Sequence, residues 1–482
     1  RTAEDHAIKS VPKNKVDHAD LWSEIETMRH LDHPHIMRLY NTFEDDMHLY
    51  MSFELCTGGS FFELLSQKGF LAESEAARIF RQIVGVVGYL HSRSICHRDL
   101  KPENFLVLRK ADVQHVQLKL IDFGTAKRFD LNQLVTKVCT PHYVAPEVLK
   151  KGQEPYTEKV DVWSCGVILF QILSGSMPFH RDNELDLLRL VKKGHFEFKP
   201  EGVWNLISVG VKALVAAMLQ VDVFSRCTAD NAFHHTWVHD QHVQDDAALS
   251  KKLMRQMHIF LTNNRLKRVA LRIIARQIND ESIDRLRSIF LSMDDDNSGT
   301  IMREEMEEAV KQLDVGEMAR AGMVEIMCQL DPTGSGTVEY TEFLAATMSK
   351  EQYLREDVCR AAFVRLDSDC DGLLSRKDLA RLLADKDGIR DAGLEGANIS
   401  ELMSELESML KEVDEDHDGG ISFDEFMDLM ADESSHFANS AVSSRRGRGR
   451  KSYAAKDFTK LEDVLGSKAD AEEISEDEED DA

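Results

Sequence analysis

Hydrophobic and polar positions alternate in two ways along the first 240 residues. Short runs rich in β-branched and aromatic residues predict strands, for example at 48–55 (HLYMSFEL) and 116–123 (VQLKLIDF). Longer stretches with apolar residues at helical spacing predict helices, for example at 77–90 (ARIFRQIVGVVGYL) and 161–173 (DVWSCGVILFQIL). We therefore predict a mixed α+β body over residues 1–240.

Residues 251–279 follow a helical pattern of another kind. They contain eight Lys or Arg and no acidic residue, and apolar residues recur along one helical face: Leu266, Val269, Ala270, Ile273 and Ile274. The pattern predicts a basic amphipathic helix within a junction at 241–280. The alternative is a solvated linker helix, but an apolar stripe needs a surface against which it can be buried.

A loop pattern repeats four times between residues 281 and 433. The repeats start at Asp294, Asp331, Asp367 and Asp414, in steps of 37, 36 and 47 residues. Four copies form two natural pairs. After residue 434 the chain turns to SSRRGRGRK and then to an acidic run, so we expect a disordered tail over 434–482.

Composition restricts the function classes. The net charge of −26 argues against nucleic-acid binding, which needs Lys and Arg to neutralise phosphates. The charge is uneven, because residues 281–433 hold 39 acidic and 15 basic residues, a net of −24. The sequence contains no run of eighteen apolar residues, so it predicts no membrane span. The eight cysteines show no zinc spacing, which favours a reducing, cytoplasmic location. The start at Arg1 suggests a fragment, so a membrane anchor remains unknown.

Three short motifs follow one another in the first 240 residues: HRDLKPEN at 97–104, DFG at 122–124 and APE at 145–147. Their order and spacing resemble the protein-kinase signature set. The resemblance covers residues 1–240 and implies the α+β bilobal kinase fold. The glycine-rich loop of that family should precede Lys9, so we expect a truncated N-terminal lobe. Catalysis in such enzymes consists mainly of positioning the reactants and neutralising phosphate charge.

The resemblance also implies roles for individual residues. Asp99 would accept the proton of the substrate hydroxyl, and Asn104 and Asp122 would hold Mg²⁺. Lys101 is the mark of serine/threonine kinases, and Thr140 should lie beside it. Reactants would be ATP and a protein Ser or Thr.

Further matches concern ATP. Lys9 resembles the lysine that grips the α and β phosphates, and Glu24 its ion-pair partner. In the expected hinge, Phe53 takes the gatekeeper position, and the backbone of Glu54 and Cys56 would bind adenine.

Other matches and departures concern the surroundings of the site. By resemblance, Glu147 and Arg226 form a buried ion pair and Asp161 braces the catalytic loop. Ser60 replaces a glutamate that binds ribose or a substrate arginine in many relatives, and Glu103 would compensate in part. Cys139 replaces a glycine before Thr140, and Thr136 is an optional phosphate acceptor. A pseudokinase scaffold is the alternative, although Lys9, Glu24, Asp99, Asn104 and Asp122 are all present.

The four repeats each fit a twelve-residue EF-hand loop: DDDNSGTIMREE at 294–305, DPTGSGTVEYTE at 331–342, DSDCDGLLSRKD at 367–378 and DEDHDGGISFDE at 414–425. Each has Gly at position 6 for the sharp turn and an apolar residue at position 8. The apolar positions predict a short β bridge between loops one and two and between loops three and four.

The oxygen donors of the four loops predict unequal Ca²⁺ sites. Site four is the most complete, site two is stiffened by Pro332, and site one has Met302 at position 9. Site three ends in Asp378, whose shorter side chain favours Mg²⁺. The expected ligands, some through backbone carbonyls, are Asp294, Asp296, Ser298, Thr300 and Glu305 in site one; Asp331, Thr333, Ser335, Thr337, Glu339 and Glu342 in site two; Asp367, Asp369, Asp371, Leu373 and Asp378 in site three; and Asp414, Asp416, Asp418, Gly420, Ser422 and Glu425 in site four.

The repeats could also form a calcium buffer, or EF-hands that have kept only a structural role. Eleven of the nineteen Met residues lie between 281 and 433, which favours a sensor whose groove grips a helix. We therefore predict an all-α, calmodulin-like domain over 281–433.

A kinase, a basic helix and four EF-hands in this order resemble the calcium-dependent protein kinases of plants and protists. NNRLKRVALRIIA at 263–275 matches that family's junction. The opposite net charges of the two segments, +8 for residues 251–279 and −24 for residues 281–433, favour binding of the basic helix by the EF-hands, and its apolar residues would enter their groove. We hypothesise that the junction blocks the substrate cleft and that calcium makes the EF-hands capture it. The alternatives are control by separate calmodulin and a calcium-responsive scaffold.

Overall fold

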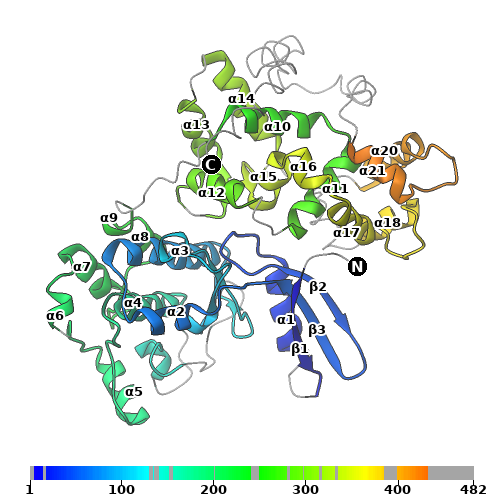
Figure 1. Ribbon diagram of the computed structural model, residues 1–482. Helices are drawn as coiled ribbons and strands as arrows, with labels where there is room; N and C mark the ends of the chain where they lie inside the picture. The colour runs from blue at the N-terminus through cyan, green and yellow to red at the C-terminus, as the bar shows by residue number, and fades with distance from the viewer. Residues whose placement is uncertain are drawn as a thin grey trace. The chain divides into compact units, whose positions relative to one another are not determined.

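The computed structural model describes twelve stretches of the chain: 5–14, 18–129, 134, 140–150, 156–199, 201–239, 249–278, 283–296, 298–313, 317–331, 335–384 and 399–431. They form two compact units, an N-terminal unit built mainly from the described residues up to 239 and a C-terminal unit built mainly from those of 249–431 (Figure 1). Five predictions concern residues outside these stretches, those for Thr136, Cys139, Pro332, Thr333 and the tail.

A three-stranded antiparallel sheet begins the N-terminal unit. Its strands, in the order β1-β3-β2, are β1 (His6–Pro12), β3 (His48–Glu54) and β2 (Leu39–Glu44). Helix α1 (His18–Arg29) runs beside the sheet (Figure 1). Buried Met51 and Phe53 of β3 share one core with Ile25 of α1. This packing holds the strand that carries Lys9 and the helix that carries Glu24 against each other.

The rest of the N-terminal unit is mainly helical. Helix α4 is almost wholly buried, as a helix that is apolar on all sides requires. Helix α3, which packs against it, is also buried over most of its length, including the consecutive residues 83–87. The helices are α2 (Phe61–Lys68), α3 (Glu73–Ser92), α4 (Lys159–Ser174), α5 (Glu184–Lys193), α6 (Glu201–Trp204), α7 (Val209–Met218), α8 (Ala229–Phe233) and α9 (Thr236–His239).

Short elements between α3 and α4 carry the candidate catalytic residues. Two antiparallel pairs, β4 with β7 and β5 with β6, fold the chain into tight loops. The elements are β4 (Ile95–Cys96), η1 (Pro102–Asn104), β5 (Phe105–Val107), η2 (Val113–His115), β6 (Leu118–Leu120), β7 (Lys127–Arg128) and η3 (Pro146–Leu149).

The C-terminal unit contains four helix–loop–helix motifs. Residues from these helices and from the junction share one hydrophobic core, which includes Phe290, Phe343, Phe363 and Phe426. The elements are α12 (Asp284–Met293), β8 (Thr300–Met302), α13 (Arg303–Lys311), α14 (Glu317–Gln329), β9 (Thr337–Glu339), α15 (Tyr340–Thr347), α16 (Lys350–Tyr353), α17 (Glu356–Leu366), α18 (Arg376–Ala384), α20 (Ile399–Val413) and α21 (Phe423–Ala431).

The junction forms two helices where the sequence pattern predicts one. Helix α10 (Lys251–Thr262) and helix α11 (Arg265–Gln277) are separated at Asn263 and Asn264. The Asn264 side chain accepts the backbone N–H of Lys267 at 2.8 Å and so caps α11. Asn prefers this N-cap position to a helix interior, which explains the break.

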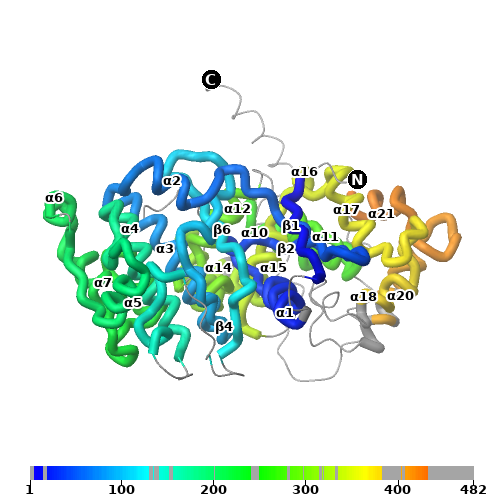
Figure 2. The backbone as a smooth tube through the Cα atoms, turned by 90° about the horizontal axis from the view of Figure 1, so that it is seen from below, coloured from blue at the N-terminus to red at the C-terminus, as the bar shows by residue number. Residues whose placement is uncertain are grey.

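Both junction helices bury their apolar faces within the C-terminal unit. Helix α11 packs against α15 and α17, and α10 packs against α14 and α15. Figure 2 shows the same neighbourhood of α10, α14 and α15 from below. The stripe from Leu266 to Ile274 is therefore covered by EF-hand helices. Among the described residues, no helix is long and apolar enough to cross a membrane.

Candidate functional site

One buried carboxylate, that of Asp161, holds the start of the loop at 97–104 in place. Asp161 of α4 accepts the backbone N–H groups of His97 and Arg98, each at 2.8 Å, and His91 Nε2 lies 3.0 Å from it. Burial opposes the charged form of Asp161, but these hydrogen bonds keep its pKa below the ordinary value. The predicted bracing role of Asp161 agrees with this geometry.

A second buried contact joins Glu147 to Arg226. The guanidinium donates two hydrogen bonds to the carboxylate, at 2.6 and 3.0 Å, and both residues are buried. Such paired, parallel hydrogen bonds fix geometry as well as charge. The predicted ion pair is therefore present.

Three candidate residues, Lys101, Thr140 and Asn104, gather around Asp99. Lys101 Nζ lies 2.5 Å from Oδ2, and the Thr140 hydroxyl donates to Oδ1 at 2.6 Å. Lys101 also donates to Thr140 at 3.2 Å, as predicted from their sequence positions. The Asn104 amide donates to the Asp99 backbone carbonyl at 2.7 Å. The arrangement places an oriented carboxylate beside a cation and a hydroxyl.

Asp122 lies near Glu24, the ion-pair partner of Lys9. Lys9 Nζ lies 2.6 Å from Glu24 Oε1. A Cβ placed on Gly124 would lie 3.3 Å from Asp122 Oδ1 and 3.4 Å from Glu24 Oε2, so these carboxylates flank the same glycine. Asp122 adopts a φ of 64°. The residue before it, Ile121, donates its backbone N–H to the carbonyl of Asn104 at 2.9 Å, which ties Asp122 to the loop of Asn104.

The expected hinge follows β3. Phe53 is buried in the core of the unit, and Glu54 is almost fully buried, whereas Cys56 is partly exposed. Sequence reasoning assigned only the backbone of Glu54, yet its side chain pairs with Lys119 at 2.8 Å. The sequence does show Lys119 as a single cation within an apolar predicted strand, which indicates that it needs a buried partner.

Ser60 has a structural role that the resemblance to the kinase family did not suggest. Its hydroxyl accepts the backbone N–H of Glu63, and the Glu63 carboxylate accepts the N–H of Ser60, at 3.2 and 3.1 Å. This capping box starts α2. Glu63 therefore places an acidic group next to Ser60.

The four EF-hand loops share their backbone geometry. Gly299, Gly336, Gly372 and Gly419, at position 6 of each loop, all have positive φ, between 75° and 100°. Only glycine adopts this conformation without strain. Position 8 forms the predicted bridges, Ile301 with Val338 and Leu374 with Ile421. The loops therefore pair as one with two and three with four.

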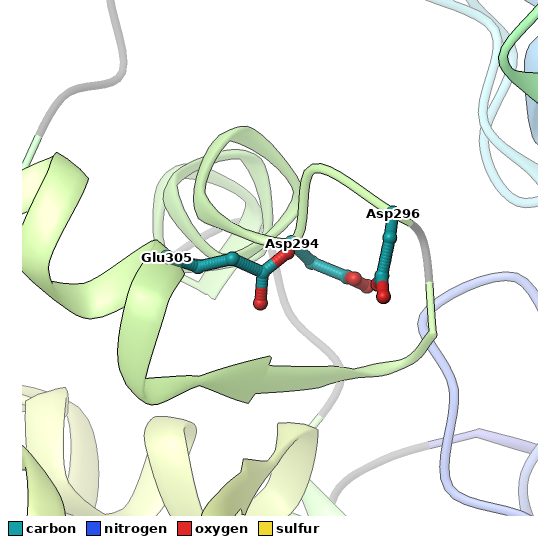
Figure 3. Close-up of side chains that lie close together, drawn as sticks. All are labelled: Asp294, Asp296 and Glu305. Atoms are coloured by element: carbon teal, nitrogen blue, oxygen red, sulfur yellow. The ribbon is translucent and has the colours of Figure 1, made fainter.

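Carboxylates converge in three of the loops. In loop one, Asp294, Asp296 and Glu305 each place an oxygen within 4.8 Å of the others, and Figure 3 shows the three side chains pointing toward a common space. Loop three gathers Asp367, Asp369 and Asp371, and loop four gathers Asp414, Asp416 and Glu425. Clustered carboxylate oxygens suit Ca²⁺, a hard cation, so the donor sets of these loops fit it.

Loop three does not include its last residue in the cluster. Asp378 is buried, and its two oxygens accept hydrogen bonds from the hydroxyl and backbone N–H of both Ser368 and Ser375, at 2.6 to 3.0 Å. These donors hold its pKa below the ordinary value although burial alone would raise it. Arg381 lies 3.3 Å from Asp369 in the same loop. Asp378 thus bonds to its own loop but lies outside the group of close carboxylate oxygens.

Loop two differs again. Among the described residues, its carboxylates do not form a group of three close oxygens. Asp331 accepts the N–H of Gly336 at 2.7 Å, and Ser335 contacts Thr337. Glu342 faces Arg272 of the junction at 3.6 Å, a contact that sequence reasoning did not anticipate.

The remaining predicted ligands are on their loops but contribute less to these clusters. Ser298 and Leu373 donate backbone N–H groups to Asp296 and Asp371, both at 2.9 Å. Asp418 accepts the N–H of Gly420 at 3.0 Å. Thr300 lies in β8, at position 7 of the loop.

Comparison with known proteins gives two family models. A protein kinase domain matches residues 1–238, and an EF-hand domain pair matches 283–348 and 356–431. These matches confirm the predicted fold class, a mixed α/β kinase region followed by a helical EF-hand region.

Several curated proteins are similar over most of the chain. The chain is 35% identical to Calcium-dependent protein kinase 3 of Plasmodium berghei (strain Anka) over 429 residues, 88% of this chain and 75% of that protein. It is 36% identical to Calcium-dependent protein kinase 11 of Oryza sativa subsp. japonica over 435 residues, 89% and 72% respectively. It is 34% identical to Calcium-dependent protein kinase 17 of Arabidopsis thaliana over 436 residues, 89% and 79%.

Proposed function

Because the chain belongs to the calcium-dependent protein kinase family, we propose that its own EF-hands activate the kinase when they bind calcium. Family membership establishes a serine/threonine protein kinase that uses ATP with a divalent metal ion and carries calcium-binding EF-hands. The proposal adds the control mechanism, the identity of the metal as Mg²⁺, and the roles of individual residues.

The catalytic roles follow from the contacts around Asp99. Its carboxylate, oriented by Lys101 and Thr140, accepts the proton of the substrate hydroxyl. Asn104 and Asp122 would hold Mg²⁺, which supplies positive charge to the transferred phosphoryl group. Each of these assignments remains a proposal.

ATP is held by residues of the sheet and hinge. Lys9, oriented by Glu24, binds phosphate oxygens. The backbone of Glu54 and Cys56 binds adenine, while buried Phe53 closes the rear of the pocket. The hydroxyl groups of Ser or Thr side chains in protein substrates accept the phosphoryl group.

The burial of α11 supports the control mechanism most directly. Leu266, Ala270 and Ile274 are almost fully buried in the EF-hand core. A helix held in this way is unavailable to block a substrate cleft. Calcium needs to favour this state by about 5.5 kcal/mol to move a 1:99 population to 99:1, which several bound ions could supply.

Phosphotransfer by the full-length protein onto a peptide library, titrated with free calcium, tests the proposal. We expect activity to rise over about 10⁻⁷ to 10⁻⁵ M calcium, the range of sensor EF-hands. Equal rates in chelator and in saturating calcium would refute calcium control. The D99N variant distinguishes an active kinase from a calcium-responsive scaffold. In an active kinase, D99N abolishes phosphotransfer. A scaffold has no phosphotransfer to lose and would keep its response to calcium. Added calmodulin should have no effect.

A further inference from the structure

Three of the four EF-hand loops hold their twelfth residue in the same way. One carboxylate oxygen accepts the backbone N–H of loop position 2, and the other accepts the N–H of position 9. The distances are 2.8 and 2.8 Å for Glu305, 3.0 and 2.9 Å for Asp378, and 2.8 and 2.7 Å for Glu425. Two backbone donors thus fix this carboxylate in each of these loops.

Loop two cannot form the first of these hydrogen bonds. Its position 2 is Pro332, and proline has no backbone N–H. Glu342 Oε2 still accepts the N–H of Glu339, at position 9, at 3.1 Å. The other oxygen, Oε1, lies 3.6 Å from Nη2 of Arg272. The oxygen that position 2 cannot serve in this loop therefore faces a guanidinium from α11.

The surroundings strengthen this contact. The side chains of Arg272 and Glu342 are only 9% and 13% exposed. Charges attract more strongly where water is largely excluded.

We propose that Arg272 and calcium compete for the Glu342 carboxylate, so that the junction itself is an intramolecular ligand of EF-hand two. This inference refines the proposed control mechanism and rests on it for its regulatory meaning. The twelfth loop residue binds calcium through both carboxylate oxygens. A divalent ion and a guanidinium at the same oxygen would repel each other. Arg272 must therefore move away for full coordination.

Competition has a reciprocal consequence. If docked Arg272 weakens calcium binding at site two, calcium at site two must weaken the hold of the C-terminal unit on α11 by the same factor. Site two then opposes the capture of the junction that the other sites favour. It would set an upper limit on the calcium response.

Calcium binding to a full-length chain that carries E305Q, D367N, D371N and E425Q, in which D367N and D371N remove two carboxylates of the loop-three cluster, tests the competition. These substitutions leave site two as the intact loop, and equilibrium dialysis with radioactive calcium measures its Kd. Adding R272Q should lower that Kd about tenfold, equivalent to ~1.4 kcal/mol. R272K keeps the charge and should bind as the parent does. R276Q, which removes a positive charge from the same helix, is the matched control and should also match the parent.

Two further measurements keep the result decisive. Adding E342Q to R272Q should abolish the gain, and amide hydrogen exchange should show that α11 remains protected in R272Q. Unchanged or weaker binding in R272Q would overturn the proposal, as would an equal gain in R276Q. Dialysis does not depend on kinase activity. A protein whose phosphotransfer ignored calcium, but whose site two tightened in R272Q, would refute the proposed function and retain the competition.

Discussion

Lys119 and Glu54 form a buried ion pair, with Lys119 Nζ 2.8 Å from Glu54 Oε1 and neither side chain more than 3% exposed. Glu54 ends β3 and begins the hinge, and its carboxylate also accepts the N–H of Arg38 at 2.9 Å. Lys119 lies in β6, which leads to the loop of Asp122. The pair therefore links the hinge to the strand that immediately precedes a proposed metal ligand, Asp122.

We expect K119M to destabilise the protein and weaken ATP binding. Removing one member of a buried pair leaves an uncompensated charge, which costs about 3 to 5 kcal/mol of unfolding free energy. The KM for ATP should rise more than kcat falls, because the hinge moves and Asp99 does not. Urea unfolding and steady-state kinetics measure both.

The matched control for K119M is the E54Q/K119M variant, which removes both charges. It should recover part of the lost stability, since replacing a whole buried pair is far less harmful than breaking it. A double variant less stable than K119M would show that the pair is not the source of the effect.

The same pair predicts an acid dependence. Burial favours the neutral form of Glu54, yet Lys119 and the Arg38 N–H hold its pKa below the ordinary value of 4.5. A lowered carboxyl pKa means that the stabilisation is complete above pH 4.5 and is lost as the pH falls through the folded value. Unfolding free energies measured from pH 7 downward should therefore decline less steeply below pH 4.5 in E54Q/K119M than in the natural protein. Parallel curves would contradict this.

Thr140 should contribute to turnover through Asp99. Its hydroxyl donates to Asp99 Oδ1, so T140A leaves the proposed base less firmly oriented. We expect kcat to fall about tenfold, less than the loss of 10² to 10⁴ expected for D99N. T140S keeps the hydroxyl and should restore kcat. Peptide phosphorylation at saturating ATP distinguishes these cases, and equal rates for T140A and T140S would exclude the role.

Sequence patterns predicted those features that depend on residues near one another in the chain. The four position-6 glycines adopt positive φ, and the apolar residues at position 8 form the bridges, because both follow from the geometry of a twelve-residue loop. The order of HRDLKPEN, DFG and APE similarly identified the residues that gather around Asp99.

The missed features depend on tertiary packing or on a local competition. The helical pattern continues through Asn263 and Asn264, so periodicity alone could not show that Asn264 would cap a second helix. The contact between Arg272 and Glu342 joins residues 70 positions apart, and only Pro332, with its missing N–H, gave a local sign of it. Lys119 was visible as an isolated charge without a visible partner.

The calcium sites should lose affinity unequally when the twelfth residue is neutralised. Glu425 belongs to the carboxylate cluster of loop four, whereas Asp378 is buried outside the cluster of loop three. We expect E425Q to weaken its site about 100-fold and D378N to weaken its site less than about tenfold. Calcium titration by calorimetry should resolve the two. Equal losses would contradict the structural difference between the loops.

Lys267 should be a main attachment point of the junction. Its side chain is buried, and Nζ donates to the backbone carbonyl of Met430 at 2.8 Å, one residue before the end of α21. The last carbonyls of a helix lack partners within the helix and carry partial negative charge, so they attract a cation. We expect K267M to remove this hydrogen bond while keeping much of the apolar contact. Amide hydrogen exchange in α11 should then become faster.

The matched control is K252Q, at an exposed position on α10. It removes the same charge and should leave exchange in α11 unchanged. If α11 must stay in the C-terminal unit for the kinase to act, K267M should also need more calcium for half-maximal activity, with the same maximal rate. Faster exchange without any change in the calcium requirement would separate the anchoring of α11 from kinase control. Unchanged exchange would show that apolar packing alone holds this helix.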